Sequence, residues 1–295
     1  MTDQAQRLRE MVMLKEMPFY EQSATRVLQA RVITIASGKG GVGKSNFATN
    51  LAIQLCKLGK RVVIIDADFG LANVEILLGV APKNNVSDVL NGKIDMESAL
   101  TEGPLGCMFL SGGTGINSLS ELSDNQIMRL TNGFLSLDSL TDCIVIDTRA
   151  GLSNVVINFI KAAVDTIIVT TPDPTAIADA YALIKSVRVN MPDINELKLV
   201  VNCVTCDREA REVYDKLNGA SSRFLGVDLI MLGAVPHDAY LMRAVRRQKP
   251  VSILFPNAES STSFRDISAR LLDLRVEKRN SIQNFVLKLI GKLNS

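Results

Sequence analysis

The residues of this chain with the clearest chemistry are 38–45, which read Gly-Lys-Gly-Gly-Val-Gly-Lys-Ser. They match the phosphate-loop pattern G-x-x-x-x-G-K-[ST], in which glycines let backbone N–H groups point inward around phosphate. In such a loop Lys44 reaches the β and γ phosphates, and the Ser45 hydroxyl holds Mg²⁺. The candidate nucleotide ligands of the loop are Gly38, Lys39, Gly40, Gly41, Val42, Gly43, Lys44 and Ser45.

The flanks of the loop decide whether the motif is a site or a glycine-rich turn with no ligand. Residues 31–36 form a strand-like apolar run directly before it, and residues 46–55 have helical periodicity directly after it. A strand, a glycine loop and a helix in this order place the loop at a helix N-terminus, where the dipole favours anions. The context therefore favours the phosphate site.

The rest of the chain predicts an α/β fold in which a doubly wound, mostly parallel sheet has helices on both faces. Short, continuously apolar runs alternate with helical patterns, as expected for parallel strands that are buried on both faces. The expected strands are Val32–Ala36, Arg61–Asp66, Cys107–Leu110, Cys143–Asp147, Thr166–Thr171, Leu197–Asn202 and Leu229–Val235. Ligands of such sheets lie at the carboxyl ends of the strands.

Acidic residues end two of these runs, and they are the candidates for metal binding and hydrolysis. Asp147 follows an apolar strand and is placed to hold a water of Mg²⁺. Phosphoryl transfer also needs a group that orients the attacking water, and Asp68 is the candidate for this role, with Asp66 in support. The alternative for each carboxylate is a helix cap at the strand end.

A second lysine inside the loop, Lys39, gives it a form that resembles the deviant phosphate loop of the MinD/ParA ATPases. The resemblance implies ATP or ADP with Mg²⁺ as cofactors, a dimer that forms with ATP, and a first lysine that contacts the nucleotide of the partner subunit. It also implies that Asn202 meets the adenine and that Pro236 and Asp238 belong to the loop over the base. The alternatives are a solvated loop charge for Lys39 and plain structural roles for the others.

Residues 147–151, Asp-Thr-Arg-Ala-Gly, resemble the second switch of that family, and Asp66-Ala-Asp68 resembles the first. Arg149 departs from the family pattern, which has small residues after Asp-Thr. This cation would either contact the γ-phosphate or obstruct the switch and slow turnover, and the sequence leaves both open.

Composition excludes several other classes of protein. The chain has 295 residues, is 47% hydrophobic and carries a net charge of +2 with acids and bases mixed, so no sequence-specific nucleic-acid surface is expected. No signal peptide or membrane-length apolar run is present, which predicts a cytoplasmic protein. The five cysteines have no disulfide-framework spacing. Cys203 and Cys206 leave open an iron–sulfur carrier, although a strand-end and a loop cysteine are the favoured interpretation.

The N-terminal residues resemble a particular branch of the MinD/ParA family. Thr2-Asp-Gln-Ala-Gln-Arg-Leu-Arg9 is similar to the activator peptide of the FlhG/FleN (YlxH) flagellar-number ATPases. The resemblance implies a segment, residues 1–25, that docks on an FlhF-type GTPase and stimulates it. The contact residues it implies are Asp3, Gln4, Ala5, Leu8 and Arg9. A mobile polar N-terminus is the alternative.

At the other end, residues 281–293 predict an amphipathic helix with one apolar stripe and basic neighbours. The stripe consists of Ile282, Phe285, Val286, Leu289, Ile290 and Leu293. The helix either packs on its own domain or binds an anionic membrane surface, and the family resemblance favours the membrane. The expected organisation is therefore an activator segment at 1–25, an ATPase domain at 30–275 and a membrane helix at 278–295.

Together with these features, the family resemblance implies a slow, switch-type ATPase that dimerises with ATP, lies on the inner face of the cell membrane and controls flagellar number or placement. The resemblance adds flagellar C-ring proteins or a flagellar transcription regulator as partners. The alternatives are a MinD-type septum-site ATPase, which would lack the Asp-Gln-Ala start, and the iron–sulfur carrier.

Overall fold

The computed structural model describes residues 30–68, 73–112 and 123–273. Its centre is an eight-stranded sheet in the order β3-β4-β2-β5-β1-β6-β7-β8. The pairs are parallel except for β3 with β4, which are antiparallel. The strands are β1 (Arg31–Ala36), β2 (Val62–Ala67), β3 (Thr101–Glu102), β4 (Met108–Leu110), β5 (Cys143–Thr148), β6 (Asp165–Thr170), β7 (Glu196–Val204) and β8 (Asp228–Pro236).

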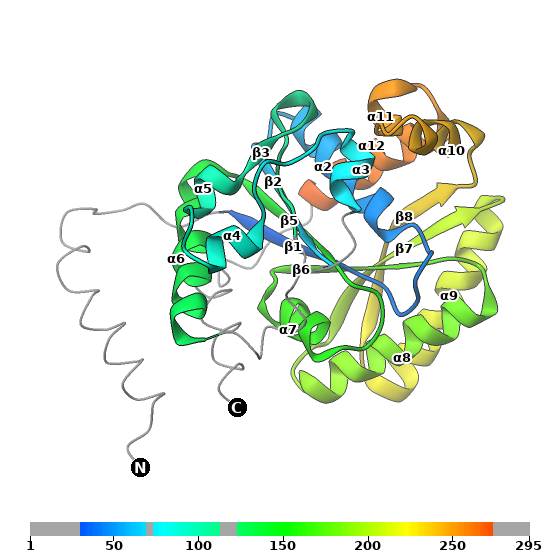
Figure 1. Ribbon diagram of the computed structural model, residues 1–295. Helices are drawn as coiled ribbons and strands as arrows, with labels where there is room; N and C mark the ends of the chain where they lie inside the picture. The colour runs from blue at the N-terminus through cyan, green and yellow to red at the C-terminus, as the bar shows by residue number, and fades with distance from the viewer. Residues whose placement is uncertain (1–29, 69–72, 113–122, 274–295) are drawn as a thin grey trace, which may run out of the picture.

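Helices cover both faces of this sheet (Figure 1). One face packs against α2 (Lys44–Lys57), α10 (Ala239–Arg246), α11 (Val251–Leu254) and α12 (Glu259–Asp273). The other packs against α4 (Val86–Leu90), α5 (Met96–Ala99), α6 (Asp124–Leu140), α7 (Asn154–Ala162), α8 (Pro174–Asn190) and α9 (Asp207–Leu225). A short α3 (Val74–Leu78) follows β2, and a 3-10 turn, η1 (Pro104–Gly106), precedes β4. The α/β doubly wound prediction is confirmed.

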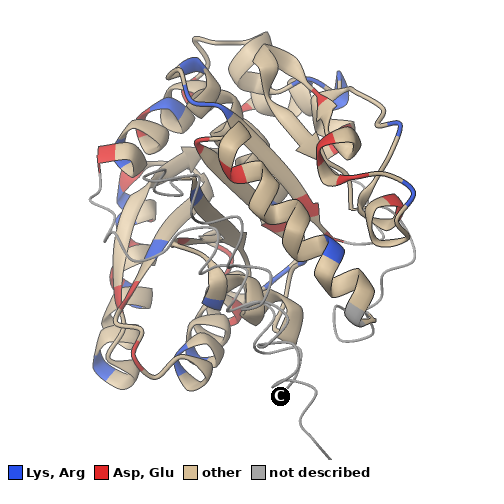
Figure 2. Ribbon diagram, turned by 90° about the vertical axis from the view of Figure 1, so that its left-hand side faces the viewer, with Lys and Arg blue, Asp and Glu red and all other residues tan. Residues whose placement is uncertain are grey.

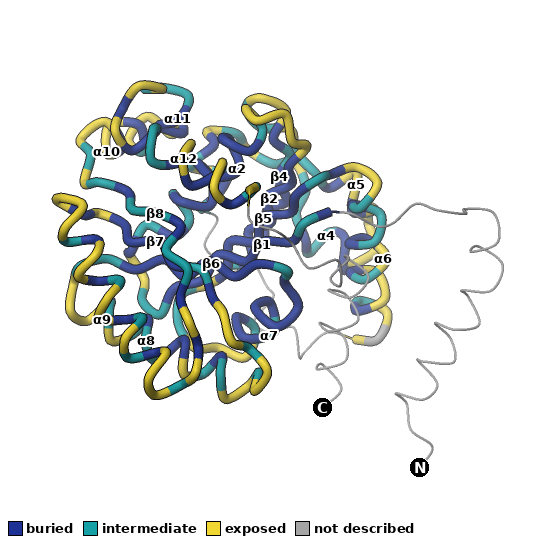
Figure 3. Tube along the Cα trace, turned by 180° about the vertical axis from the view of Figure 1, so that it is seen from behind, coloured by how far each residue is buried: buried dark blue, intermediate teal, exposed yellow. Residues whose placement is uncertain are grey.

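The burial pattern explains why the apolar runs became strands. Every residue of β2, β5 and β6 is buried, and these strands form the dark core between the helical layers in Figure 3. Side chains that alternate along a strand enter the cores of opposite faces. Along β1, Ile33 packs in the core with α2, whereas Val32 packs in the core with α6. The sheet is therefore held rigidly from both sides.

The seven predicted strands are all present, with ends that shift by one or two residues. β2 starts at Val62 rather than Arg61, and β7 runs on to Val204. The edge strand β3 was not predicted, because two residues carry no period that a sequence can show.

Charged residues of both signs are interspersed over the helices in Figure 2, in agreement with the small net charge. Among the described residues, no helix is long and apolar enough to cross a bilayer. The predicted activator segment and membrane helix lie outside the described residues.

Candidate nucleotide site

The phosphate loop joins β1 to α2 at the carboxyl edge of the sheet. Gly41 and Gly43 have φ values of 81° and 83°, which side chains with a Cβ rarely adopt. Gly43 is the N-cap of α2, and it supplies no side chain to the free N–H groups of the first turn. That turn also contains no acidic residue. The N-terminus of α2 is thus an uncapped, positively polarised cradle for an anion.

Two glycines of the loop allow close approach of other elements. A Cβ at Gly38 would lie 2.1 Å from the carbonyl oxygen of Asp179 in α8. A Cβ at Gly43 would lie 2.2 Å from the amide nitrogen of Asn202 at the end of β7. The loop is therefore wedged between α8 and β7, so its shape is fixed before any ligand arrives.

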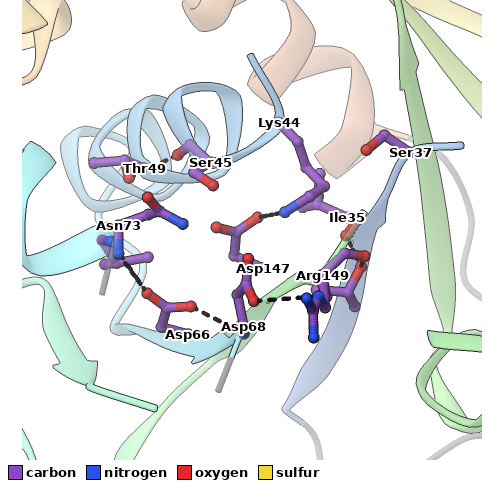
Figure 4. Close-up of polar contacts among 12 residues, drawn as sticks. Ile35, Ser37, Lys44, Ser45, Thr49, Asp66, Asp68, Asn73, Asp147 and Arg149 are labelled. Carbon is purple, nitrogen blue, oxygen red and sulfur yellow. Dashed lines mark hydrogen bonds and ion pairs between the residues drawn. The ribbon is translucent and has the colours of Figure 1, made fainter. Parts of the chain in front are cut away.

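The central contact of the site is a buried ion pair between the loop lysine and the acid of β5. Lys44 Nζ lies 2.5 Å from Asp147 Oδ1, and the two side chains are 8% and 0% exposed (Figure 4). A buried charge is tolerated only when it is paired, so each group compensates the other. The sequence predicted both residues for the site, and the fold brings them together.

The second oxygen of Asp147 fits a role near a metal ion. Asp147 Oδ2 is buried and has no hydrogen-bond partner among the described residues. In Figure 4 the Ser45 hydroxyl lies on the side of this oxygen. A hydroxyl and a carboxylate are hard oxygen donors, which suit Mg²⁺ with its retained waters. The residues present therefore fit a magnesium–nucleotide complex, in which Ser45 would be a ligand of the metal and Asp147 would hold it through a water.

Asp66 has a different environment, because its carboxylate holds the chain that follows β2. Its Oδ1 accepts a hydrogen bond from the amide of Asp68 at 3.1 Å, and its Oδ2 accepts from those of Asn73 and Val74 at 3.0 and 3.2 Å. Burial, together with the nearby charge of Asp147, raises the pKa of Asp66 to about 7 against the effect of these three amides. Asp66 therefore links β2 to the start of α3, which refines its predicted supporting role.

Asp68 lies in the same group and faces two cations. Burial raises the pKa of its carboxyl, whereas the charges of Lys44 and Arg149 oppose that shift. Arg149 Nε is 3.9 Å from Asp68 Oδ1, and the Asp68 side chain is 14% exposed (Figure 4). A carboxylate at this position can accept a proton or orient a water, so the geometry is compatible with the role predicted for it.

The second lysine of the loop points to other partners than Lys44. Lys39 Nζ contacts the hydroxyl of Thr175 and lies 3.5 Å from Asp173 Oδ2, and its side chain is 40% exposed. Asp173 is the N-cap of α8. Lys39 therefore sits at the surface of the site, attached to the start of α8. Sequence analysis missed these two partners, although the Asp173-Pro174 pair is a readable helix start.

The three residues predicted near the base are placed by the ends of β7 and β8. Asn202 is buried and donates through Nδ2 to the carbonyl of Val42 at 2.8 Å, while its Oδ1 is buried with no partner among the described residues. This oxygen could accept a hydrogen bond from the amino group of adenine. Pro236 ends β8. Asp238 caps α10 and also accepts from the Ser260 hydroxyl at 2.7 Å, so its carboxylate is already engaged.

The two cysteines that the sequence singled out lie at the surface of the described part of the chain. Cys203 and Cys206 are both exposed. In the part of the chain that the structure describes, no group of three or more His, Cys, Asp or Glu side chains is arranged to hold a metal ion. Cys203 has a φ of 59° beside the register shift in β7, and Cys206 is the N-cap residue of α9.

Asp66 gives a pH prediction for the nucleotide-free protein. Its folded pKa of about 7 lies above its ordinary value of 3.8. Protonation of Asp66 therefore stabilises the folded state in full below about pH 4, and this stabilisation is lost as the pH rises through about 7. The melting temperature of the wild type should fall by several degrees between about pH 5 and 8. Asp66→Asn, which cannot titrate, should flatten this dependence.

The exposed Asp266→Asn is the control, and equal slopes for Asp66→Asn and wild type would contradict the assignment.

Comparison with known proteins identifies relatives of this chain. The family model for ParA, described as a NUBPL iron-transfer P-loop NTPase, matches residues 29–272. Antiactivator FleN of Pseudomonas aeruginosa is 35% identical over 262 residues, which cover 88% of this chain and 93% of FleN. Flagellum site-determining protein YlxH of Helicobacter pylori is 35% identical over 301 residues, which cover 99% of this chain and 100% of YlxH.

Solved structures give the same fold. A chain of the MinC:MinD cell division complex of Aquifex aeolicus matches with a TM-score of 0.67 and 26% identity, over 84% of this chain and 98% of that one. MinD of Pyrococcus horikoshii, complexed with Mg-ADP, matches with a TM-score of 0.65 over 83% of this chain and 97% of its own, and at 22% identity it shows the fold alone. With a family match across the core and similarity to FleN and YlxH along nearly the whole chain, the protein belongs to the MinD/ParA family of P-loop ATPases, in the branch of FlhG, FleN and YlxH.

Proposed function

We propose that this ATPase is a nucleotide-controlled switch that sets the number or placement of flagella. It hydrolyses ATP to ADP and phosphate, forms a dimer when ATP is bound, and acts from the inner face of the cell membrane. The names of the two relatives, an antiactivator and a flagellum site-determining protein, support the flagellar part of this proposal. The YlxH match extends along 99% of the chain rather than over the ATPase core alone.

The observation that carries the switch is the separation of the two loop lysines. Lys44 is buried against Asp147, whereas Lys39 is 40% exposed and held at the start of α8. A lysine that served the nucleotide of its own subunit would not need to face the surface. Lys39 is therefore free to cross to the nucleotide of a partner subunit once its contacts with Asp173 and Thr175 are released.

Hydrolysis uses the groups at the carboxyl edge of the sheet. Lys44 and the amides at the start of α2 bind and orient the phosphates, which is the main contribution to phosphoryl transfer. Bound Mg²⁺ supplies charge neutralisation, with Ser45 and a water on Asp147 as its holders. Asp68 orients the attacking water. Asn202 positions the base through its free oxygen, beside the loop of Pro236 and Asp238.

Two alternatives fit parts of the same observations. A MinD-type septum-site ATPase would share the core, and several MinD proteins are 30–31% identical to this chain. The flagellar relatives are more similar, at 35% identity, and the YlxH match covers 99% of this chain. An iron–sulfur carrier would need Cys203 and Cys206 from two copies, and absorption spectra after anaerobic reconstitution would reveal such a cluster.

The first prediction separates the two lysines. Lys44→Ala should abolish ATP binding, because it removes the main phosphate charge and leaves Asp147 buried without its partner. Lys39→Ala should bind ATP and remain a monomer. Calorimetry measures binding, and size-exclusion chromatography with light scattering measures the dimer. The control is Lys93→Ala, because Lys93 is exposed. Lys161 on α7 is buried and is therefore not suitable as a control. A Lys39→Ala protein that dimerises normally with ATP would remove the role across the interface.

The second concerns the N-terminal segment, which lies outside the described residues. Residues Asp3–Arg9 as a free peptide should raise the GTPase rate of an FlhF-type partner. Gln4→Ala and Leu8→Ala should weaken this effect, because one removes a polar contact and the other an apolar anchor. The peptide with Gln6→Ala is the control. No stimulation by the wild-type peptide would favour the septum-site alternative.

The third concerns residues 281–293, also outside the described residues. Six apolar side chains are worth roughly 1.5–3 kcal/mol each if fully buried, and each nearby Lys or Arg adds about 1 kcal/mol at an anionic surface. Partial immersion and ordering of the helix reduce that sum, so one helix binds weakly and a dimer with two binds better. We expect sedimentation with anionic vesicles to require ATP, and Leu289→Glu to abolish it without loss of ATP binding. Equal sedimentation with ADP and ATP would place the helix in the folded core instead.

A further inference from the structure

Arg149 lies opposite Asp68 because of the register between β2 and β5. In that register Asp66 pairs with Asp147, and Ala67 pairs with Thr148. The next positions along the two strands are Asp68 and Arg149, whose side chains approach to 3.9 Å (Figure 4). The register of the sheet thus places these two positions beside each other, directly after the ends of the two strands.

The backbone on both sides of Arg149 is fixed beside the phosphate loop. The Thr148 hydroxyl donates to the carbonyl of Ile35 in β1 at 2.9 Å. The amide of Gly151 donates to the carbonyl of Ser37, the residue before Gly38, also at 2.9 Å. The main chain that carries Arg149 is therefore held in place at the edge of the nucleotide site.

The side chain of Arg149, by contrast, extends toward solvent. It is 68% exposed, and its ion pair with Asp68 is long. A long ion pair whose cation is exposed to solvent contributes little to stability, so a stronger anion can displace the carboxylate. A guanidinium prefers phosphate oxygens, to which it can donate two parallel hydrogen bonds.

The anion that would compete is the terminal phosphate of ATP. Asp68 is influenced by both Lys44 and Arg149, so these two cations act on the same small region. Lys44 is the lysine of the loop that binds the β and γ phosphates. A γ-phosphate that contacts Lys44 therefore also comes under the influence of the Arg149 charge, whereas ADP has no phosphate at that position.

We propose that Arg149 is a sensor of the γ-phosphate: it pairs with Asp68 in the absence of ATP, and it transfers to the γ-phosphate when ATP binds. The transfer releases the Asp68 carboxylate at the moment when an attacking water has to be oriented. ADP leaves the Arg149–Asp68 pair intact. This inference rests on the proposed role of Asp68 in hydrolysis, and it makes Arg149 a specificity residue for ATP over ADP.

The test is the ratio of affinities for a non-hydrolysable ATP analogue and for ADP, both with Mg²⁺, measured by calorimetry on the full chain. Arg149→Gln should reduce the preference for the ATP analogue about tenfold, the size of one charge-assisted contact, and leave the affinity for ADP unchanged within about twofold. Arg149→Lys, which keeps the charge but not the paired hydrogen bonds, should restore part of the preference. Arg208→Gln, at an arginine on α9 that is 87% exposed, is the matched control.

Each outcome decides the proposal. Equal losses for both nucleotides would assign Arg149 a structural role in its loop, and a stronger preference for the ATP analogue would mean that Arg149 obstructs the site; either overturns the sensor. Unchanged melting of nucleotide-free Arg149→Gln confirms that the fold is intact. If the wild type binds both nucleotides and Arg149→Gln has the same ratio of affinities as the wild type, only the sensor proposal is overturned. A wild-type protein that binds neither would overturn the nucleotide site as well.

Discussion

The buried ion pair between Lys44 and Asp147 is the contact on which the rest of the site depends. One partner begins α2 and the other is part of β5, so the pair joins the phosphate loop to the centre of the sheet. Neither charge could remain there unpaired, because burial of a lone charge costs several kcal/mol. A nucleotide changes this balance, since its phosphates bring new negative charge to Lys44 and its Mg²⁺ brings positive charge to Asp147.

The register of β2 against β5 places three further charged side chains beside that pair. Asp66 and Asp147 are paired positions, and Asp68 and Arg149 follow them. Because burial and a like charge nearby both disfavour ionisation, a buried carboxyl beside another acid holds its proton more tightly than usual. Asp66 is such a carboxyl, and its pKa rises to about 7. Its amide contacts then connect any change of charge at the site to the start of α3.

The opposite edge of the sheet uses charges in another way. There Asp165 is buried and accepts from Arg31 at 2.6 Å and from Lys198 at 2.9 Å. The two cations keep the pKa of Asp165 below its ordinary value even though burial acts in the other direction. In that cluster the carboxylate is paired with two cations of the protein itself, although Arg31 Nη2 has no hydrogen-bond partner among the described residues. At the carboxyl edge, Asp147 Oδ2, Asn202 Oδ1 and the N-terminus of α2 are left for a ligand. These unpaired acceptors and the helix N-terminus lie together beside the phosphate loop, where a nucleotide would bind.

The sequence by itself determined the α/β class, the seven longer strands and the residues of the phosphate loop, because burial on both faces makes a strand continuously apolar and because phosphate binding needs glycines at fixed positions. It also identified Asp66, Asp68, Asp147 and Asn202 as strand-end residues. Their contacts with one another were beyond it, since residues up to 160 positions apart, such as Asn202 and Val42, meet only through strand order. The tertiary structure decided that Lys44 pairs with Asp147, that Lys39 is held by Asp173 and Thr175, and that Arg149 faces Asp68. Each of these depends on the order and register of strands, which the local pattern of a single chain does not encode.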